Sequence, residues 1–297
     1  MVVRMPRLPP RIGLALGSGS ARGWSHIGVI RALAEAGIEP DIVCGCSIGA
    51  LVGAAYVYGE LDKLENWVAS LKWKDVLGLL DVSFNGGLIK GEKLIDFIRR
   101  HFVDHDFDTL GKPFACVATD LESGREIWLR DGSVAEAVRA SFAVPGLFTP
   151  RLRDGRLLVD GGLVNPVPVS LCRALGADLV IAVDLGSERA GRWHQQTDTA
   201  PANGWKQKLL QGIGLAAANS EDTEALPSLI AVLTGSLQIM QVRIARSRLA
   251  GEPADVMLSP RLGQVGMMEY HRGPECIAEG RAEVDRMLPA IRHALEA

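Results

Sequence analysis

The sequence contains few of the features that mark a secreted, metal-binding or nucleic-acid-binding chain. Cysteine is scarce, aromatic residues make up 5% of the 297 positions, and no acidic or basic run occurs. The five cysteines are odd in number and lie mostly in apolar segments, which favours buried reduced thiols over a disulfide framework. They are Cys44, Cys46, Cys116, Cys172 and Cys276. The spacing of the first two does not suit a metal site.

The charge balance also narrows the choice of partners. Lysine and arginine total 32 against 35 acidic residues, a net charge of -3, which argues against a nucleic-acid surface. Residues 1–11 carry charge but no apolar stretch, so we expect a tail without a signal peptide. We therefore expect a cytoplasmic protein, and peripheral contact with the inner face of the membrane stays open. Because 47% of the residues are apolar, the chain can build a large core.

Residues 43–50 (VCGCSIGA) have the pattern of a nucleophile elbow. The preceding residues predict the end of a buried strand and residues 48–58 predict a helix, with Gly45, Ser47 and Gly49 between them. A side chain at the tip of this turn strains the backbone, and the positions two residues away must lack a Cβ where strand and helix approach. The pattern predicts an exposed Ser47 hydroxyl beside a helix N-terminus, where negative charge is favoured. A chance occurrence of the motif is the alternative.

A small-residue loop precedes the elbow. Residues 12–16 predict a strand and residues 24–36 a helix, and the loop between them reads GSGSARG, from Gly17 to Gly23. A dinucleotide-binding loop would need glycine where Arg22 stands, and an acidic residue at the end of the next strand. We therefore disfavour a nucleotide, and the sequence implies no cofactor.

The same loop suits an oxyanion hole. The backbone amides of Ser18, Gly19 and Ser20 would point outward at the positive end of a helix dipole, one strand away from Ser47. Arg22 opposes that dipole, so we expect it to have a partner and to hold the loop in place. A solvated arginine is the alternative.

A third motif is the run Asp160, Gly161 and Gly162. Residues 152 and 157–159 flank an Asp-Gly hairpin turn, and the second strand runs into Asp160. In an open α/β sheet, ligands bind at the carboxyl edge of the strands, so an aspartate held there would face a site. An ordinary Asp-Gly turn is the alternative.

Strands and helices alternate along the rest of the chain. Apolar runs predict strands at residues 114–119, 126–129, 179–183 and 254–259, and helical patterns occupy residues 61–71, 91–102, 134–140, 169–176 and 275–295, with a turn at 85–87. Such alternation predicts an α/β fold with a mostly parallel sheet covered on both faces. We expect residues 12–297 to form a single domain, with residues 188–250 as a mobile loop and helical cap.

One segment invites a metal interpretation. His101 and His105 lie at helical spacing in an acidic stretch, but no further ligand completes a known pattern nearby. A solvated loop is favoured, and we expect no metal.

Residues 225–242 carry no formal charge and precede Arg243, Arg246 and Arg248. Proline, threonine, glycine, serine and glutamine interrupt the segment, which argues against a transmembrane helix. It predicts either a helix packed on the sheet or a partly exposed apolar helix beside the site, with the arginines toward lipid phosphates.

Together the motifs resemble the patatin-like phospholipase family, and its small bacterial RssA-type members in particular. The resemblance covers nearly the whole chain, through residues 17–33 (GSGSARGWSHIGVIRAL), 45–49 (GCSIG), 140–148 (ASFAVPGLF), 160–169 (DGGLVNPVPV) and 248–255 (RLAGEPAD). It implies a three-layer α/β/α fold and a phospholipase, lysophospholipase or general carboxylesterase with a Ser-Asp dyad, which would be Ser47 and Asp160. The family's loop often has glycine where this chain has Ser18 and Ser20, so the added side chains would narrow the acyl entrance.

A Ser-Asp dyad requires that the pKa of Asp160 lie above its ordinary value. A carboxyl group with a pKa of about 3.9 is a poor base for serine, so burial must raise the pKa. A Ser-His-Asp hydrolase or acyltransferase stays open because His194, His271 and His293 follow Asp160, although an elbow normally lies deeper in the chain of an α/β-hydrolase. A lipid-binding or regulatory protein with weak activity is the other alternative. The sequence sets no oligomeric state.

Overall fold

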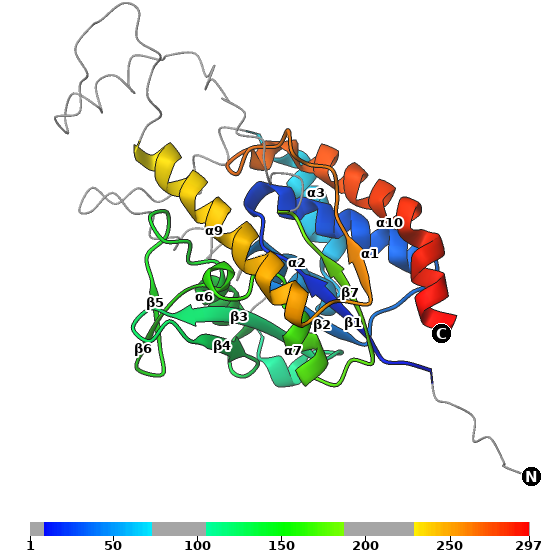
Figure 1. Cartoon of the computed structure of the whole chain (residues 1–297), viewed down its shortest axis with the longest axis horizontal. Helices are drawn as coiled ribbons and strands as arrows, with labels where there is room; N and C mark the ends of the chain where they lie inside the picture. Colours follow the sequence, from blue (N-terminus) through cyan, green and yellow to red (C-terminus); the bar gives the residue numbers. More distant parts are fainter. Residues whose placement is uncertain (1–8, 73–104, 187–228, 297) are drawn as a thin grey trace, which may run out of the picture.

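The computed structural model describes residues 9–72, 105–186 and 229–296, and its strands form one eight-stranded sheet. The strand order is β5-β6-β3-β2-β1-β7-β8, and β4 also pairs with β3 (Figure 1). The strands are β1 (Ile12–Leu16), β2 (Ile42–Cys46), β3 (Phe114–Asp120), β4 (Glu126–Leu129), β5 (Arg151–Arg153), β6 (Arg156–Asp160), β7 (Leu179–Val183) and β8 (Val256–Leu258). Strands β3, β2, β1, β7 and β8 run parallel, whereas β4, β5 and β6 pair antiparallel.

Helices cover the sheet on both faces. They are α1 (Ser25–Glu35), α2 (Ile48–Val57), α3 (Leu61–Ser70), α6 (Val134–Ser141), α7 (Val169–Ala174), α9 (Leu229–Gly251) and α10 (Gly273–Glu296). Short 3-10 turns follow β1 as η1 (Ser20–Trp24), precede β3 as η2 (Phe107–Thr109), follow β6 as η3 (Gly161–Leu163) and precede α10 as η5 (Tyr270–Arg272).

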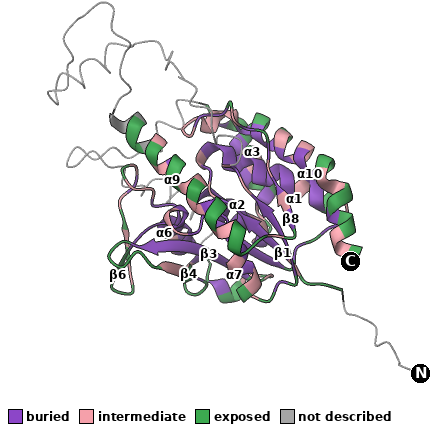
Figure 2. Ribbon diagram, viewed as in Figure 1, coloured by how far each residue is buried: buried purple, intermediate pink, exposed green. Residues whose placement is uncertain are grey.

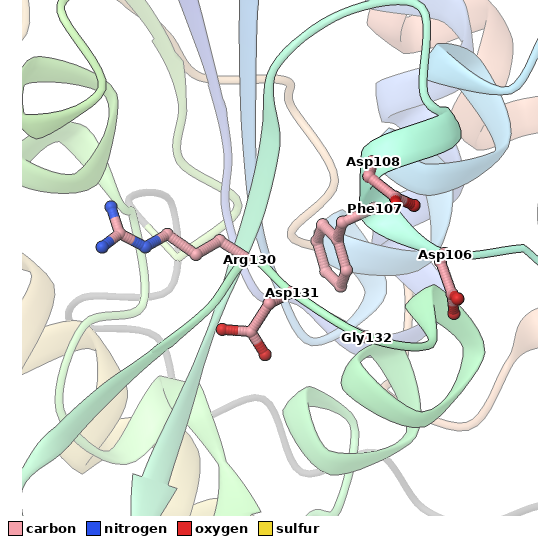
Figure 3. Close-up of a pocket in the computed structure, with 6 residues that line it drawn as sticks. All are labelled: Asp106, Phe107, Asp108, Arg130, Asp131 and Gly132. Carbon is pink, nitrogen blue, oxygen red and sulfur yellow. The ribbon is translucent and has the colours of Figure 1, made fainter.

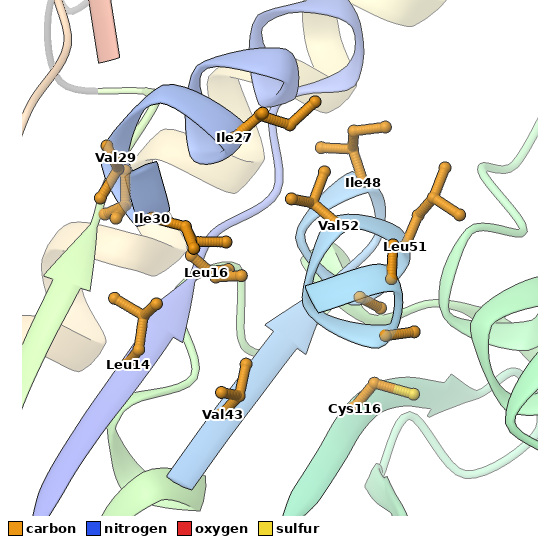
Figure 4. Packing of buried hydrophobic residues seen from close by; sticks show 14 of the residues in the cluster. Leu14, Leu16, Ile27, Val29, Ile30, Val43, Ile48, Leu51, Val52 and Cys116 are labelled. Carbon is orange, nitrogen blue, oxygen red and sulfur yellow. The ribbon is translucent and has the colours of Figure 1, made fainter. Parts of the chain in front are cut away.

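The alternation of side chains along β1 separates two cores. Leu14 and Leu16 belong to the larger core with residues of α1, α2 and α10, whereas Ala15 belongs to a smaller core with residues of α7. Figure 4 shows Leu14, Leu16 and Val43 on the face of the sheet that α1 and α2 cover. Each parallel strand is therefore buried on both faces, which explains its continuous apolar sequence. The predicted three-layer α/β/α fold with a mostly parallel sheet is confirmed.

The C-terminal part of the predicted cap is helical. Helix α9 runs from Leu229 to Gly251 and includes Arg243, Arg246 and Arg248. Gln238 and Ala245 are buried, whereas Ile239 and Met240 are exposed, so α9 packs through one stripe only (Figure 2). Within the described residues, no helix combines the length and the apolar character that crossing a bilayer requires. The predicted turn at 85–87, the helix at 91–102 and the loop at 188–204 lie outside the described residues.

Candidate active site

The elbow at Ser47 has the strained geometry that its sequence predicts. Ser47 connects β2 to α2 with φ 56° and ψ -121°, a left-handed conformation that is unfavourable for a residue with a Cβ. A Cβ at Gly45 would lie 2.5 Å from the backbone nitrogen of Ala50, and one at Gly49 would lie 2.1 Å from the carbonyl oxygen of Leu16. Both glycines are therefore required by the close packing of α2 on the sheet.

The Ser47 hydroxyl is buried, so the prediction of an exposed hydroxyl is wrong. Ser47 is 4% exposed, and its Oγ donates a hydrogen bond to Asp160 Oδ2 at 2.5 Å. Its backbone amide donates to the Oγ of Ser141, at the end of α6, at 2.9 Å. The side chain faces a carboxylate inside the protein rather than solvent. Sequence reasoning missed Ser141, because only the three-dimensional approach of α6 gives that serine a role.

Asp160 reaches Ser47 from an antiparallel strand. Although β6 runs antiparallel to β3, Asp160 lies at the carboxyl edge of the parallel strands, as we expected. It pairs with Ala118, one residue beyond the Val117 that pairs with Cys46 at the end of β2. Asp160 is fully buried, and its Oδ1 accepts from the Gly162 amide at 2.7 Å. Burial raises the pKa of Asp160 from 3.8 to about 6, and the hydrogen bonds from Ser47 and Gly162 lower it in part. Asp160 is thus a stronger base than an exposed carboxylate, which a Ser-Asp dyad would require.

The two glycines after Asp160 make room for this arrangement. A Cβ at Gly161 would lie 2.2 Å from the Val117 carbonyl oxygen, and one at Gly162 would lie 2.8 Å from Asp160 Oδ1. Thr119 Oγ1 donates to the Asp160 carbonyl at 2.8 Å. The Asp-Gly-Gly run is therefore more than an ordinary turn, because it lets the chain leave β6 while an amide holds the carboxylate.

Backbone hydrogen bonds hold the start of the small-residue loop, and one of them uses the Ser18 amide. The Gly17 amide donates to the Val183 carbonyl at 3.1 Å, and the Ser18 amide donates to the Pro166 carbonyl at 2.8 Å. A Cβ at Gly17 would also lie 2.5 Å from the Val183 carbonyl oxygen. Since the Ser18 amide already has an acceptor, its predicted place in an oxyanion hole is wrong.

His26, which the sequence reasoning did not single out, holds the same loop. Its Nε2 lies 2.8 Å from the Gly17 carbonyl oxygen, and because a carbonyl only accepts, Nε2 carries the proton. Complete burial lowers the pKa of His26 to about 4, although the hydrogen bond to Gly17 acts in the opposite direction. The ring therefore stays neutral near neutral pH.

The amides of Gly19 and Ser20 remain available. Within the described part of the chain, neither amide donates a hydrogen bond to another residue. Gly19 has an extended φ of 171°, which any residue adopts, but a Cβ there would lie 2.8 Å from the Cβ of Leu185. Packing against Leu185 therefore requires glycine at this position.

Arg22 has the partners that we expected, and it is also buried. It is 3% exposed, and its Nη1 donates to the Leu185 carbonyl at 2.9 Å. With its amide oxygen toward Arg22, Gln238 of α9 accepts from Nη2 at 2.8 Å. The next residue, Gly23, packs so closely on α2 that a Cβ would lie 2.1 Å from the Ile48 side chain. Arg22 thus connects the loop to α9, and solvation of this arginine is excluded.

No described histidine hydrogen-bonds to Asp160. The carboxylate of Asp160 accepts from Ser47 and Gly162, and within the described ranges no imidazole hydrogen-bonds to either carboxylate oxygen. His26 is directed to Gly17, and His194 lies outside the described residues. His271 and His293 belong to η5 and α10.

The acidic segment around residue 106 lines a pocket that includes neither Ser47 nor Asp160. Asp106 and Asp108 line it with Phe107, Arg130, Asp131 and Gly132 (Figure 3). His105 stacks on Tyr58, with ring centroids 4.4 Å apart, and His101 lies outside the described residues. The described residues contain no group of three side chains that could hold a metal.

Helix α9 flanks the site, but one of its arginines turns inward. A Cβ at Gly162 would lie 2.5 Å from Gln241 Nε2, which places α9 beside η3. Arg248 donates to Glu126 Oε2 of β4 at 2.8 Å, so its predicted direction toward lipid is wrong. Arg243 and Arg246 are exposed.

The fold and the site define an α/β protein with a serine elbow and a buried acidic partner, and comparison with known proteins identifies the family. The family model described as patatin-like phospholipase matches residues 14–173. An uncharacterized NTE family protein of Mycobacterium tuberculosis is 34% identical over 333 aligned residues, covering 95% of this chain and 92% of that protein. The chain therefore belongs to the patatin-like phospholipase family.

Other relatives share a shorter region. Patatin-like phospholipase domain-containing protein 6 of Homo sapiens is 38% identical over 186 residues, which is 60% of this chain and 13% of that protein. Lysophospholipase nte1 of Aspergillus fumigatus is 37% identical, over 59% of this chain and 12% of that protein. Among solved structures, VipD of Legionella pneumophila has a TM-score of 0.50 at 16% identity and covers 95% of this chain and 67% of VipD, which supports the fold alone.

Proposed function

We propose that this chain is a lipid acyl hydrolase in which Ser47 is the nucleophile and Asp160 is the general base. The observation that carries the proposal is the 2.5 Å hydrogen bond from Ser47 Oγ to the buried Oδ2 of Asp160. A nucleophile and a base within hydrogen-bond distance, with the base raised in pKa, are what acyl transfer requires. Membership of a phospholipase family supports a lipid ester as the substrate.

The geometry supports a two-step reaction. As Ser47 Oγ attacks the ester carbonyl, its proton passes to Asp160, and the oxyanion faces the free amides of Gly19 and Ser20. Asp160 then gives the proton to the leaving alcohol, and an acyl-enzyme remains on Ser47. A water molecule, deprotonated by Asp160, releases the fatty acid and restores the serine. The Gly162 amide holds Oδ1, so Oδ2 is the oxygen that carries the proton.

Two other functions have less support. A Ser-His-Asp mechanism needs a base between serine and aspartate, yet Ser47 already donates directly to Asp160. A purely lipid-binding or regulatory protein would have no need of a strained elbow and a buried carboxylate in contact.

The lipid surface and the compartment are also parts of the proposal. We expect α9 to face a lipid surface beside the site, through its exposed apolar residues and the exposed Arg243 and Arg246. Five buried, unpaired cysteines suit a reducing compartment, so we place the protein in the cytoplasm, at the inner face of the membrane when it acts.

A panel of lysophospholipids, phospholipids and short esters tests the function. We expect Ser47→Ala and Asp160→Asn each to lower kcat by more than about a thousandfold, and the double variant to be no worse, since the two residues act as a unit. Ser70→Ala is the matched control because Ser70 is exposed on α3 and donates only to the Trp67 carbonyl. Turnover equal to that of the parent in Ser47→Ala would contradict the assignment of Ser47 as the nucleophile.

A further inference from the structure

Ser20 links the oxyanion loop to a segment far along the chain. Its Oγ lies 2.6 Å from the Met267 carbonyl oxygen and 2.6 Å from the Tyr270 hydroxyl oxygen. Because a carbonyl only accepts, the Ser20 hydroxyl donates to Met267, and the Tyr270 hydroxyl therefore donates to Ser20 Oγ. The direction of both hydrogen bonds is thus determined.

The backbone of Ser20 depends on these contacts. Ser20 has φ 53°, a left-handed conformation that favours glycine and strains a serine. The amide of Ala21 donates to the same Met267 carbonyl at 3.1 Å. The side-chain and backbone hydrogen bonds to Met267 offset the strain and fix the rotation of Ser20, which sets where the free amides of Gly19 and Ser20 point.

The Tyr270 end of the contact is also held firmly. Trp24 Nε1 donates to the Tyr270 carbonyl at 3.1 Å, and the two rings pack edge to face with centroids 6.0 Å apart. Burial raises the pKa of Tyr270 to about 12, the hydrogen bond with Ser20 lowers it, and the negative charge of Asp160 raises it further. The phenol therefore keeps the proton that it donates, and it lies within the electrostatic reach of the dyad.

We propose that Ser20 and Tyr270 are positioning residues, which together hold the amides of Gly19 and Ser20 toward the carbonyl oxygen of an ester bound at Ser47. The inference rests on the proposed function and adds the side chains of Ser20 and Tyr270 to the residues on which the reaction depends. It also accounts for serine at a position where the family often has glycine, because the hydroxyl ties the loop to residues 267–270, beyond the matched region 14–173. A glycine at position 20 would relieve the strain but would leave the loop without this anchor.

The test compares Ser20→Ala, Tyr270→Phe and the double variant with the parent protein on a short-chain ester. We expect each single variant to lower kcat by about tenfold, less than the loss of a whole oxyanion donor, with KM changed by less than about twofold. The double variant should be no slower than the slower single variant, because both changes break one chain of hydrogen bonds. Ser70→Ala and Tyr56→Phe are matched controls, since Ser70 and Tyr56 make side-chain hydrogen bonds away from the loop.

Hydrogen exchange of the resting proteins separates this inference from the proposed function. We expect the Ala21 amide to exchange faster in Ser20→Ala and Tyr270→Phe than in the parent, whereas the control variants keep the parent rate. An active parent whose variants keep both kcat and Ala21 protection would overturn the positioning role alone. Additive losses in the double variant, or a change in KM with kcat unchanged, would also overturn it. A parent that hydrolyses no ester would overturn the proposed function, and the positioning role with it.

Discussion

In the proposed mechanism, the acidity of Asp160 sets the pH range in which Ser47 can react. Burial raises the pKa of Asp160 to about 6, and only the ionised carboxylate can take the serine proton. We therefore expect kcat/KM to fall tenfold per pH unit below about pH 6 and to be level from about pH 7 to 8. The measurement is a pH profile of kcat/KM with a neutral ester.

The temperature dependence of this acid limb identifies the titrating group. The ionisation of a carboxyl group changes little with temperature, whereas that of an imidazole changes strongly. We expect a midpoint that moves little between two temperatures. A midpoint that shifts strongly, and that disappears in His271→Ala, would support the histidine mechanism instead.

Ser47 and Asp160 also depend on each other for stability. In Ser47→Ala a buried carboxylate loses a donor, so we expect a cost of about 1–3 kcal/mol at pH 8, where Asp160 is ionised. The pKa of Asp160 is higher in the folded protein than in the unfolded chain, so the folded protein holds this proton more tightly. The contribution of Asp160 to the free energy of unfolding is therefore lost as the pH rises through about 6. The cost should therefore be smaller at pH 5, where the folded protein binds this proton.

Urea unfolding at the two pH values measures this difference. Ser70→Ala should match the parent at both pH values, because its hydroxyl is exposed and bonded only to a local carbonyl. An equal cost for Ser47→Ala at pH 5 and pH 8 would contradict a direct bond to an ionisable partner.

At the scale of single elements, local motifs could be predicted and their partners could not. The elbow was predictable because Gly45, Ser47 and Gly49 satisfy steric demands within one turn. The direction of β6 could not be predicted. An Asp-Gly hairpin fixes the pairing of β5 with β6, but it does not determine how the two strands are oriented beside β3. The Ser18 amide was assigned wrongly because its acceptor, Pro166, comes from a distant segment.

Helix α9 is the element that we propose to face a lipid surface. Val232, Leu233, Ile239 and Met240 are 42–55% exposed, and Arg243 and Arg246 follow them along the helix. Changing both arginines to glutamate should weaken binding to anionic vesicles by at least about 1 kcal/mol for each charge. A vesicle sedimentation assay measures the effect.

The control for this helix is Arg292→Glu, which reverses an exposed arginine on α10. It should leave vesicle binding unchanged, and the α9 variant should still hydrolyse a monomeric short ester. Equal binding by the α9 variant and the parent would show that α9 is an ordinary surface helix.

At the scale of the whole molecule, the fold could be predicted for two reasons. Strands that are buried on both faces have continuous apolar sequences, and the motifs occur along the chain in the order that is typical of the family. The burial of Ser47 and Asp160 could not be predicted, because it depends on how β6, α6 and η3 meet. Residues such as His26 and Tyr270 carry no local signal, since their roles depend on hydrogen bonds to distant backbone.

The cysteines give a prediction for the molecule as a whole. All five are buried, and burial raises the pKa of Cys44, Cys46, Cys116 and Cys276, so little thiolate is present at neutral pH. A thiol reagent should react with the native protein only at the rate of unfolding, and activity should not depend on a reductant. Fast reaction of one or more thiols in the native protein would contradict this packing.

The most direct test of the central claim is covalent labelling by a fluorophosphonate probe, with the modified residue located by mass spectrometry. The account predicts one label, on Ser47, with a rate that falls below about pH 6 as Asp160 takes up a proton. Asp160→Asn should label far more slowly, Ser47→Ala should not label, and Ser70→Ala should label as the parent does. Absence of label in the active parent, or a label on another serine that is lost together with hydrolysis, would contradict the Ser47–Asp160 mechanism.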